Sequence, residues 1–347
     1  MRAIVYHGPG RKSWEEVPKP SIHEDSDAIV RVDAVTICGT DLHILKGDVP
    51  AVTEGRILGH EAVGTIEEVG SGVTTVAPGD RVLVSCITAC GRCRFCREGR
   101  YGLCTGGGSW ILGHRIDGTQ AEYVRVPFAD TSIYRVPDGV SDESVLMLAD
   151  ICPTSYEVGV LNGRVGPGDT VAVVGAGPIG LAAILTAQLF SPSQIVAVDI
   201  ADSRLDAAKQ FGAGVLVNNG RDNAAERIRE ITGGLGADTA IEAVGIPETF
   251  ELCASLVRPG GVVANVGVHG APATLHLEDL WIKGVTITTG LVDTYSTPTL
   301  LQLIRSGQLD VSRFVTHRYT MDGFLEAYDT FSRAGETGAL KVVLTRS

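Results

Sequence analysis

A glycine-rich turn between two apolar runs constrains the fold of this 347-residue chain more than any other feature. Val171–Val174 are apolar, which is typical of a strand buried on both faces. Gly175–Gly180 then read G-x-G-x-x-G, and an apolar helical run follows at Leu181–Phe190. A second predicted strand ends at Asp199, about twenty residues after the last glycine. This order of strand, turn, helix, strand and acid is the context that marks a dinucleotide site.

Each position in the turn has a physical reason. Gly175 allows a tight turn, Gly177 lets the backbone approach a pyrophosphate, and Gly180 lets the helix pack close to the strand. Pro178 suits the first helical turn, where its missing N–H costs nothing. The free N–H groups of that turn, which includes Ile179, would face the phosphates. Three glycines and a proline argue against the alternative interpretation of the apolar run as a membrane span.

The acid after the second strand predicts the type of dinucleotide. Asp199 can accept hydrogen bonds from both ribose hydroxyls of NAD, and its charge would repel the 2′-phosphate of NADP. Asp202 adds to that negative field. Arg204 is the nearest cation and is predicted to contact the cofactor, although a position on the helix face is the simpler interpretation. We therefore expect NAD as the cofactor.

Size and charge exclude several classes of protein. A chain of this length favours two domains. A hydrophobic fraction of 44% and a charged fraction of 20% are ordinary for a globular enzyme. The net charge of −12 argues against nucleic-acid and anionic-membrane partners. The start MRAIVYHGPG lacks a signal peptide's apolar core, so a cytoplasmic protein is expected.

The secondary-structure pattern changes along the chain. Short alternating or β-branched runs predict a β-rich, barrel-like first part, with strands at Met1–Tyr6, Ala28–Ile37, Ala62–Val69, Arg81–Ser85 and Gln120–Val126. Helical character follows at Ser141–Tyr156. Six predicted strands alternate with helices from Val171 to about residue 292, which indicates a doubly wound parallel sheet. The remainder is expected to return to the first domain, so that residues 1–152 and 293–347 form one domain and residues 153–292 are an inserted Rossmann domain.

Four of the eight cysteines lie close together in the sequence. Their spacing is C-x2-C-x2-C-x7-C, and they are Cys90, Cys93, Cys96 and Cys104. Four thiolates complete a tetrahedral zinc shell and leave no position for chemistry. An intracellular chain of this size uses such clusters for metal more often than for disulfides. We predict a structural zinc lobe at about residues 86–110.

Two further residues are candidate metal ligands, Cys38 in CGTDLH and His60 in GHE. Alone, a single cysteine is usually a small buried apolar residue, and a single histidine is usually structural. Five blocks together, however, resemble the medium-chain zinc-dependent alcohol dehydrogenase family: Cys38–His43, Gly59–Gly64, Pro78–Val82, the cysteine lobe, and the glycine turn with Asp199. The similarity spans essentially the whole chain and implies a GroES-like catalytic domain around the inserted Rossmann domain.

The resemblance implies a second, catalytic zinc. Its ligands would be Cys38, His60 and Asp150, with Cys152 as the competing third ligand and Glu61 as an outer acid or an alternate fourth ligand. Asp150 is favoured because Thr154 then falls where the family places a threonine near the nicotinamide. With three protein ligands, the fourth position is left for water or substrate. Asp41 is a candidate partner for His60, with a solvated loop acid as the alternative.

The resemblance also implies a proton path and further contacts. Thr40 would accept the substrate proton and pass it through the cofactor ribose to His43. The positions that match cofactor contacts of the family are Val268, Leu291 and Lys341. Candidate residues of the substrate pocket are Cys86, Trp110, Ile111, Leu291 and Tyr295. Packing under the cysteine lobe is an equally good interpretation of Trp110.

The function expected is reversible hydride transfer between NAD and a secondary or small primary alcohol. One alternative is a polyol or amino-alcohol dehydrogenase of the sorbitol or threonine type. The other is a zinc- and NAD-binding protein without turnover. The apolar run Val285–Thr289 would be an exposed sheet edge in a monomer, so a homodimer or homotetramer is expected.

Overall fold

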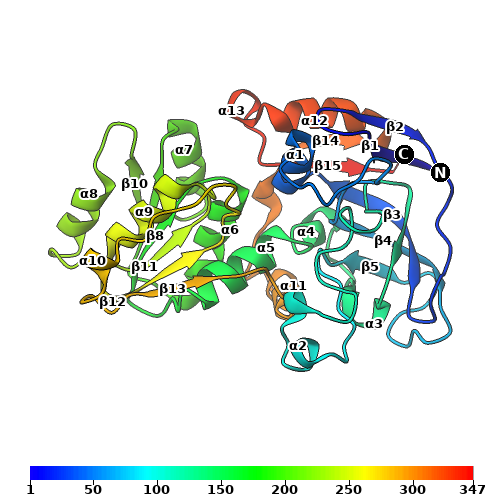
Figure 1. Ribbon diagram of the computed structural model, residues 1–347, viewed down its shortest axis with the longest axis horizontal. Helices are drawn as coiled ribbons and strands as arrows, with labels where there is room; N and C mark the ends of the chain where they lie inside the picture. The colour runs from blue at the N-terminus through cyan, green and yellow to red at the C-terminus, as the bar shows by residue number, and fades with distance from the viewer. Residues whose placement is uncertain (347) are drawn as a thin grey trace. The chain divides into compact units, whose positions relative to one another are not determined.

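The computed structural model describes residues 1–346, which form two compact units. The first unit comprises Met1–Asp150 and the segment from Asp293 onward, and the second unit comprises Ile151–Val292 (Figure 1). Our predicted division differs only at the first boundary, which we placed after residue 152. None of the helices in residues 1–346 has the length and apolar character needed to cross a bilayer.

The second unit contains a parallel six-stranded sheet with the order β10-β9-β8-β11-β12-β13. The strands are β8 (Thr170–Val174), β9 (Gln194–Asp199), β10 (Val215–Asn218), β11 (Ala237–Glu242), β12 (Val257–Asn265) and β13 (Thr286–Thr289). The strand order reverses between β8 and β11, and ligands of such sheets bind outside the carboxyl ends of the strands at this point. The glycine-rich turn follows β8 directly. The predicted doubly wound sheet is confirmed.

Helices connect these strands. They are α5 (Ile151–Thr154), the π-helix Ser155–Leu161, α6 (Pro178–Ala187) with a 3₁₀ turn at Gln188–Phe190, α7 (Asp202–Gln210), α8 (Ala224–Ile231), α9 (Pro247–Leu256) and α10 (Leu277–Leu280). α6 begins at Pro178, immediately after the N-cap residue Gly177. The proline removes only an N–H that no helical carbonyl would accept.

The first unit is built on a seven-stranded, mainly antiparallel sheet, with the order β14-β15-β3-β4-β5-β7 and β6 paired to β3. A separate hairpin joins β1 to β2. The strands are β1 (Arg2–Tyr6), β2 (Lys12–Glu16), β3 (Ala28–Thr36), β4 (Ala62–Val69), β5 (Arg81–Val84), β6 (Tyr123–Val126), β7 (Ile133–Arg135), β14 (Val315–Thr320) and β15 (Lys341–Thr345). Figure 1 shows β15, in red, beside the blue strand β3.

The helices of the first unit are short. They are α1 (Gly39–Lys46), α2 (Arg94–Arg97), α3 (Ala129–Ser132), α4 (Asp142–Leu146), α11 (Thr297–Arg305), α12 (Phe324–Ser332) and α13 (Ala334–Thr337), with 3₁₀ turns at Tyr101–Leu103, Ser312–Phe314 and Met321–Gly323. Phe324, Tyr328 and Phe331 of α12 are buried in the apolar core that also contains β3 and β4. The C-terminal segment therefore completes the core of the N-terminal sheet.

The helical character predicted at Ser141–Tyr156 is confirmed, and it is divided among several elements. The chain forms α4, a turn, α5 and then the π-helix. In the turn, the N–H groups of Leu148 and Ala149 donate to carbonyls three residues earlier, which tightens the backbone. Pro153 supplies no N–H to continue the ladder from the preceding turn. Asp150 lies at this irregular point of the backbone, and its side chain belongs to the candidate metal cluster described below.

Asp130 of α3 anchors the loop between β4 and β5. It accepts hydrogen bonds from the N–H and the hydroxyl of both Thr74 and Thr75, at 2.8–3.2 Å. Partial burial alone would raise the pKa of Asp130, but these donors lower it to about 2 from the ordinary 3.8.

We therefore expect the Asp130→Asn variant to have a lower Tm at pH 7, by about 2–4 °C, which is the effect of about 1 kcal/mol in a domain of this size. Because the folded-state pKa is depressed, the wild-type advantage is complete above about pH 4 and is lost as the pH falls through 2. Thermal melts of both proteins from pH 7 to pH 2 measure this. A Tm difference that stays constant over the range would contradict the assignment.

Candidate active site

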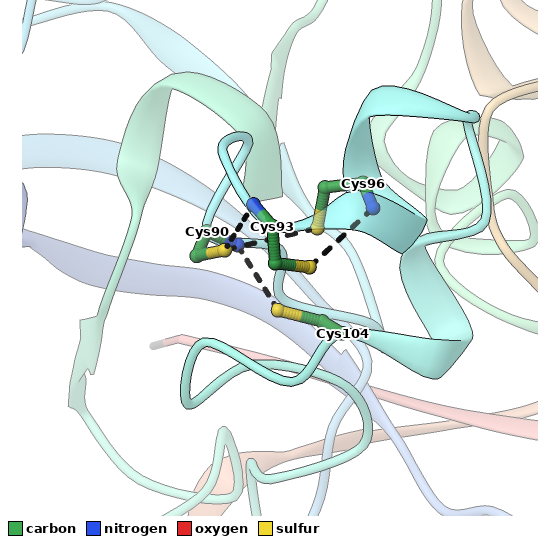
Figure 2. Close-up of side chains that lie close together, drawn as sticks. All are labelled: Cys90, Cys93, Cys96 and Cys104. Atoms are coloured by element: carbon green, nitrogen blue, oxygen red, sulfur yellow. Dashed lines mark hydrogen bonds between the residues drawn. The ribbon is translucent and has the colours of Figure 1, made fainter.

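The four cysteines of the predicted lobe converge on one point. Their sulfur atoms lie within 4.8 Å of one another (Figure 2). Cys93 caps α2, and the N–H groups of Cys93 and Cys96 donate to the sulfurs of Cys90 and Cys93 at 3.4 and 3.5 Å. The N–H of Cys90 donates to the Cys104 sulfur at 3.4 Å. Such donors stabilise thiolates, and the pKa of Cys93 is lowered to about 5. The set fits a closed tetrahedral zinc site.

A second cluster combines Cys38, His60, Glu61 and Asp150, whose ligand atoms also lie within 4.8 Å of one another. The strands explain how residues distant in sequence meet. β3 and β4 are antiparallel with Val35 opposite Ala62, so the residue after β3 and the residues before β4 are neighbours. The turn after α4 brings Asp150 to the same place. Asp150, rather than the competing Cys152, joins the cluster in residues 1–346.

The distances in this cluster fit a tetrahedral metal. The Oδ2 atom of Asp150 lies 3.4 Å from Nε2 of His60 and 3.5 Å from Sγ of Cys38. Ligands that are 2.0–2.3 Å from a tetrahedral ion are themselves separated by about 3.3–3.8 Å. A thiolate, an imidazole and a carboxylate are also the donor types that zinc takes. The three residues therefore suit zinc in both geometry and chemistry.

Burial makes the charged forms of these side chains unfavourable unless a cation lies close to them. His60 and Glu61 are 4% and 0% exposed. Burial raises the pKa of Cys38, and the nearby Asp150 carboxylate raises it further. Burial also raises the pKa of Glu61. Burial alone would lower the pKa of His60, but the Asp150 carboxylate and Cys38 raise it well above its ordinary value. A metal ion would relieve this crowding of like charges.

A buried hydrogen-bond chain supports Cys38. The Oδ2 atom of Asp41 accepts the N–H of Cys38 at 2.8 Å and the Nε2 group of Gln120 at 2.9 Å. The hydroxyl of Tyr328, on α12, donates to Oε1 of Gln120 at 2.6 Å. Asp41 was a candidate partner for His60, with a solvated loop acid as the alternative; it is 1% exposed, and its hydrogen bonds go to Cys38 and Gln120. Sequence reasoning missed Gln120 and Tyr328, because neither belongs to a metal or nucleotide motif.

Lys341 lies at the start of β15, under the same cluster. Its Nζ atom donates to Oε1 and Oε2 of Glu61 at 2.9 and 2.8 Å, and both side chains are 1% exposed. The predicted cofactor contact of Lys341 stays a prediction; the contact that the structure gives is this ion pair.

The predicted proton path begins close to the cluster. The hydroxyl oxygen of Thr40 lies 3.7 Å from Sγ of Cys38. His43, on the same helix α1, is 49% exposed and its Nδ1 lies 2.9 Å from Oδ2 of Asp48. An exposed imidazole next to a carboxylate can exchange a proton with solvent.

Two candidate pocket residues also lie near the cluster. Sγ of Cys86 is 3.8 Å from Oδ1 of Asp150. The ring of Trp110 stacks on His114, with centroids 4.3 Å apart, and meets His60 edge-on at 6.3 Å. This ring therefore lies near the metal cluster, and in the chain it directly follows the cysteine lobe.

The glycine-rich turn of the second unit has the geometry of a nucleotide site. Gly175 has φ +95°, a conformation that side chains disfavour. Asp199 fixes the turn, because Oδ2 accepts the N–H of Ala176 at 2.8 Å while Oδ1 accepts the N–H groups of Ile200 and Ala201. A carboxylate with these bonds still has free lone pairs for ribose hydroxyls.

Arg204 points at this turn. Its Nη1 atom is buried without a hydrogen-bond partner in residues 1–346, and it lies 3.6 Å from where a Cβ on Gly177 would be. A guanidinium nitrogen without a partner beside a turn suited to phosphate fits an anionic ligand. Of the other predicted cofactor residues, Thr154 ends α5, while Val268 and Leu291 are 77% and 47% exposed.

Substitutions of two glycines in the turn are expected to affect folding and dinucleotide binding separately. A Cβ on Gly180 would lie 1.8 Å from the carbonyl oxygen of Gly175, whereas one on Gly177 would make only an ordinary contact. We expect Gly180→Ala to prevent folding of the second unit. Gly177→Ala should fold normally but bind dinucleotide at least about tenfold more weakly, or about 1.4 kcal/mol. Circular dichroism and calorimetric titration with NADH measure the two effects; a well-folded Gly180→Ala protein with normal affinity would refute the assignment.

Metal content tests the two clusters separately. We expect two zinc ions per wild-type chain and one in each of the variants Cys96→Ser and Cys38→Ser. Loss of the cysteine-lobe ion should lower the Tm, because the binding energy of a structural zinc contributes directly to folding. Elemental analysis and thermal melts give both quantities. If the wild-type chain retained only one zinc ion after metal loading, one of the two clusters would not be a zinc site.

Comparison with known proteins agrees with this geometry. Residues 24–138 match the family model described as the alcohol dehydrogenase GroES-like domain, and residues 178–306 match the model described as zinc-binding dehydrogenase. An alcohol dehydrogenase of Cupriavidus necator is 37% identical, over 99% of this chain and 98% of the relative.

Solved structures agree over the whole length. Zinc-dependent alcohol dehydrogenase 2 from Streptococcus pneumonia, in its apo form, is 47% identical with a TM-score of 0.96, covering 100% of this chain and 99% of that one. An alcohol dehydrogenase of Escherichia coli CFT073, in complex with NADH, is 27% identical with a TM-score of 0.90, covering 99% of each chain. The chain is therefore an oxidoreductase that belongs to the medium-chain zinc-dependent alcohol dehydrogenase family.

Proposed function

We propose that this enzyme transfers hydride reversibly between NAD and a secondary or small primary alcohol. The observation that supports the proposal is the cluster of Cys38, His60 and Asp150, which would supply three zinc ligands from buried or partly buried positions. Three protein ligands leave a fourth position for a substrate oxygen, in contrast to the closed shell of the cysteine lobe.

Residues of the first unit would bind the metal ion and transfer the proton. Cys38, His60 and Asp150 would hold the ion. When bound, zinc would act as a Lewis acid that makes a hydroxyl more acidic and polarises a carbonyl. Oγ1 of Thr40 would accept the hydroxyl proton. The imidazole of His43, held by Asp48, would release that proton to solvent.

The second unit would supply the cofactor site. The carboxylate of Asp199 would accept the ribose hydroxyls, and the N–H groups at the start of α6 would face the pyrophosphate. The Nη1 group of Arg204, which has no hydrogen-bond partner in residues 1–346, would donate to the bound dinucleotide. The negative charge of Asp199, together with Asp202, supports NAD over NADP.

Homo-oligomerisation is a separate part of the proposal. Trp281 and Ile282, just after α10, are 74% and 75% exposed, and Ile287 of the edge strand β13 is 36% exposed. Large exposed apolar side chains beside an unpaired strand edge are typical of an interface. We propose that a second copy of the chain covers them.

Activity assays at 340 nm with propan-2-ol, acetoin, sorbitol, threonine and benzyl alcohol test the substrate class. We expect NAD reduction with the secondary and small primary alcohols, and at least about 100-fold lower kcat/KM for Asp150→Asn, equivalent to about 3 kcal/mol of transition-state stabilisation. Asp48→Asn serves as a milder comparison, because it changes only the exposed partner of His43. Turnover confined to sorbitol would favour a polyol dehydrogenase, and no turnover with any alcohol would refute the proposal.

A further inference from the structure

His269 lies in the short loop that follows β12, one residue after the predicted cofactor contact Val268. Its Nε2 atom lies 2.9 Å from Oδ1 of Asn265 and 3.5 Å from Oε2 of Glu242, the last residue of β11. The imidazole ring meets the ring of Phe250, on α9, edge-on with the centroids 6.0 Å apart. One side chain therefore joins the ends of two neighbouring strands and the helix that packs beside them.

The hydrogen-bond partners of His269 fix which ring nitrogen carries the hydrogen. The Nδ2 group of Asn265 donates to the carbonyl oxygen of Gly267 at 2.9 Å, so this amide presents its oxygen to the imidazole. The carboxylate of Glu242 is likewise only an acceptor. Nε2 of His269 is therefore an N–H donor that faces two acceptors.

The side chain of Glu242 is 0% exposed, so its two oxygens depend on donors within the protein. Oε1 accepts three hydrogen bonds at 2.7–2.9 Å, from the N–H groups of Val244 and Gly245 and from the hydroxyl of Thr249. In the described part of the chain, Oε2 has no hydrogen-bond partner, and His269 is the one basic side chain within 4.0 Å of it. Loss of this imidazole would leave a buried carboxylate oxygen without any donor nearby, which is unfavourable.

The loops after β8, β11 and β12 are packed together without space for further side chains. A Cβ on Gly175, in the glycine-rich turn after β8, would lie 2.4 Å from Cγ2 of Val244 in the loop after β11. A Cβ on Gly245 would lie 2.5 Å from the carbonyl oxygen of Val268 in the loop after β12. The three strands are neighbours in the sheet (Figure 1), and ligands of such sheets bind outside the carboxyl ends of the strands. A shift of the loop after β12 would therefore be passed on to the glycine-rich turn.

We propose that His269 is a positioning residue of the dinucleotide site. Its Nε2–H group links the loop after β12 to the carboxylate of Glu242, and this link holds the loops beside the glycine-rich turn in the shape that binds NAD(H). Nε2 faces Glu242 and Asn265, and Nδ1 is buried without a partner in residues 1–346, so His269 acts through the loop and not by contact with the cofactor. The inference rests on the proposed function only for the place where the dinucleotide binds.

Space filling is the competing role of His269, because Phe250 packs against its ring. Two substitutions separate the two roles. His269→Leu keeps most of the apolar volume and removes the donor, whereas the amide of His269→Gln places an N–H donor near the position of Nε2. A linking role predicts weaker dinucleotide binding in the leucine variant and rescue in the glutamine variant. A packing role predicts that leucine is the better replacement.

Calorimetric titration of the full-length, metal-loaded protein with NADH measures the effect without turnover. We expect His269→Leu to bind NADH about tenfold more weakly than the wild type, and His269→Gln to stay within about threefold of it. The KM for NAD should rise with the dissociation constant, while kcat at saturating NAD changes by less than about twofold. His7→Leu removes a half-exposed histidine–glutamate pair from the first unit, so this matched control should leave the affinity for NADH unchanged.

Unchanged NADH affinity in His269→Leu, an equal loss in His269→Leu and His269→Gln, or a fall in kcat as large as the loss of affinity would each overturn the proposal. If His269→Leu does not fold, His269→Asn takes its place, because the shorter amide does not reach Glu242; a loss of affinity below about threefold would then overturn the proposal. If no substitution of His269 folds, the residue is required for folding itself and the proposal is wrong. A wild-type protein that binds NADH but oxidises no alcohol would contradict the proposed function while leaving this test intact.

Discussion

The burial of several negatively charged groups at one point is the constraint on which the first unit depends. Cys38, Glu61 and Asp150 crowd around His60, and the protein interior disfavours their charges unless cations are close. Two cations meet this requirement: the ammonium group of Lys341, which is part of the chain, and the metal ion for which the other donors are arranged. The same crowding that makes the site unfavourable alone would give it affinity for a divalent ion.

This constraint explains why the C-terminal segment returns to the N-terminal sheet. β15 pairs with β3 next to Thr36, and this pairing places Lys341 at Glu61. Tyr328 from α12 reaches Gln120 and, through it, Asp41 and the backbone of Cys38. The last fifty or so residues therefore do not merely close the fold. They supply the charge and the hydrogen bonds that surround the candidate metal site built from the first half of the chain.

The two metal clusters differ in the way that their chemistry requires. The cysteine lobe takes all its ligands from one short segment, so its spacing alone predicted the site. The Cys38 cluster takes its ligands from the end of β3, the start of β4 and the turn after α4. Sequence spacing indicated no relation between those segments, and the expected ligands came from the resemblance to a known family. The candidate pairing of Asp41 with His60 was wrong in its partner. The helical character predicted at Ser141–Tyr156 is divided between α4, α5 and the π-helix, because the backbone turns at Asp150.

The sequence by itself determined the features that depend on neighbouring residues. These are the strand, glycine turn and helix of the nucleotide site, the compact cysteine lobe and the alternation that predicts a parallel sheet. Local patterns suffice there, because a turn, a helix start and a closely spaced ligand set involve only short-range geometry. Only the tertiary structure decided that Lys341 faces Glu61, that Gln120 links Tyr328 to Asp41, and that Nη1 of Arg204, beside Gly177, has no hydrogen-bond partner within residues 1–346. These contacts join segments far apart in the chain, and their residue types are equally compatible with a solvated surface until strand pairing and burial bring them together.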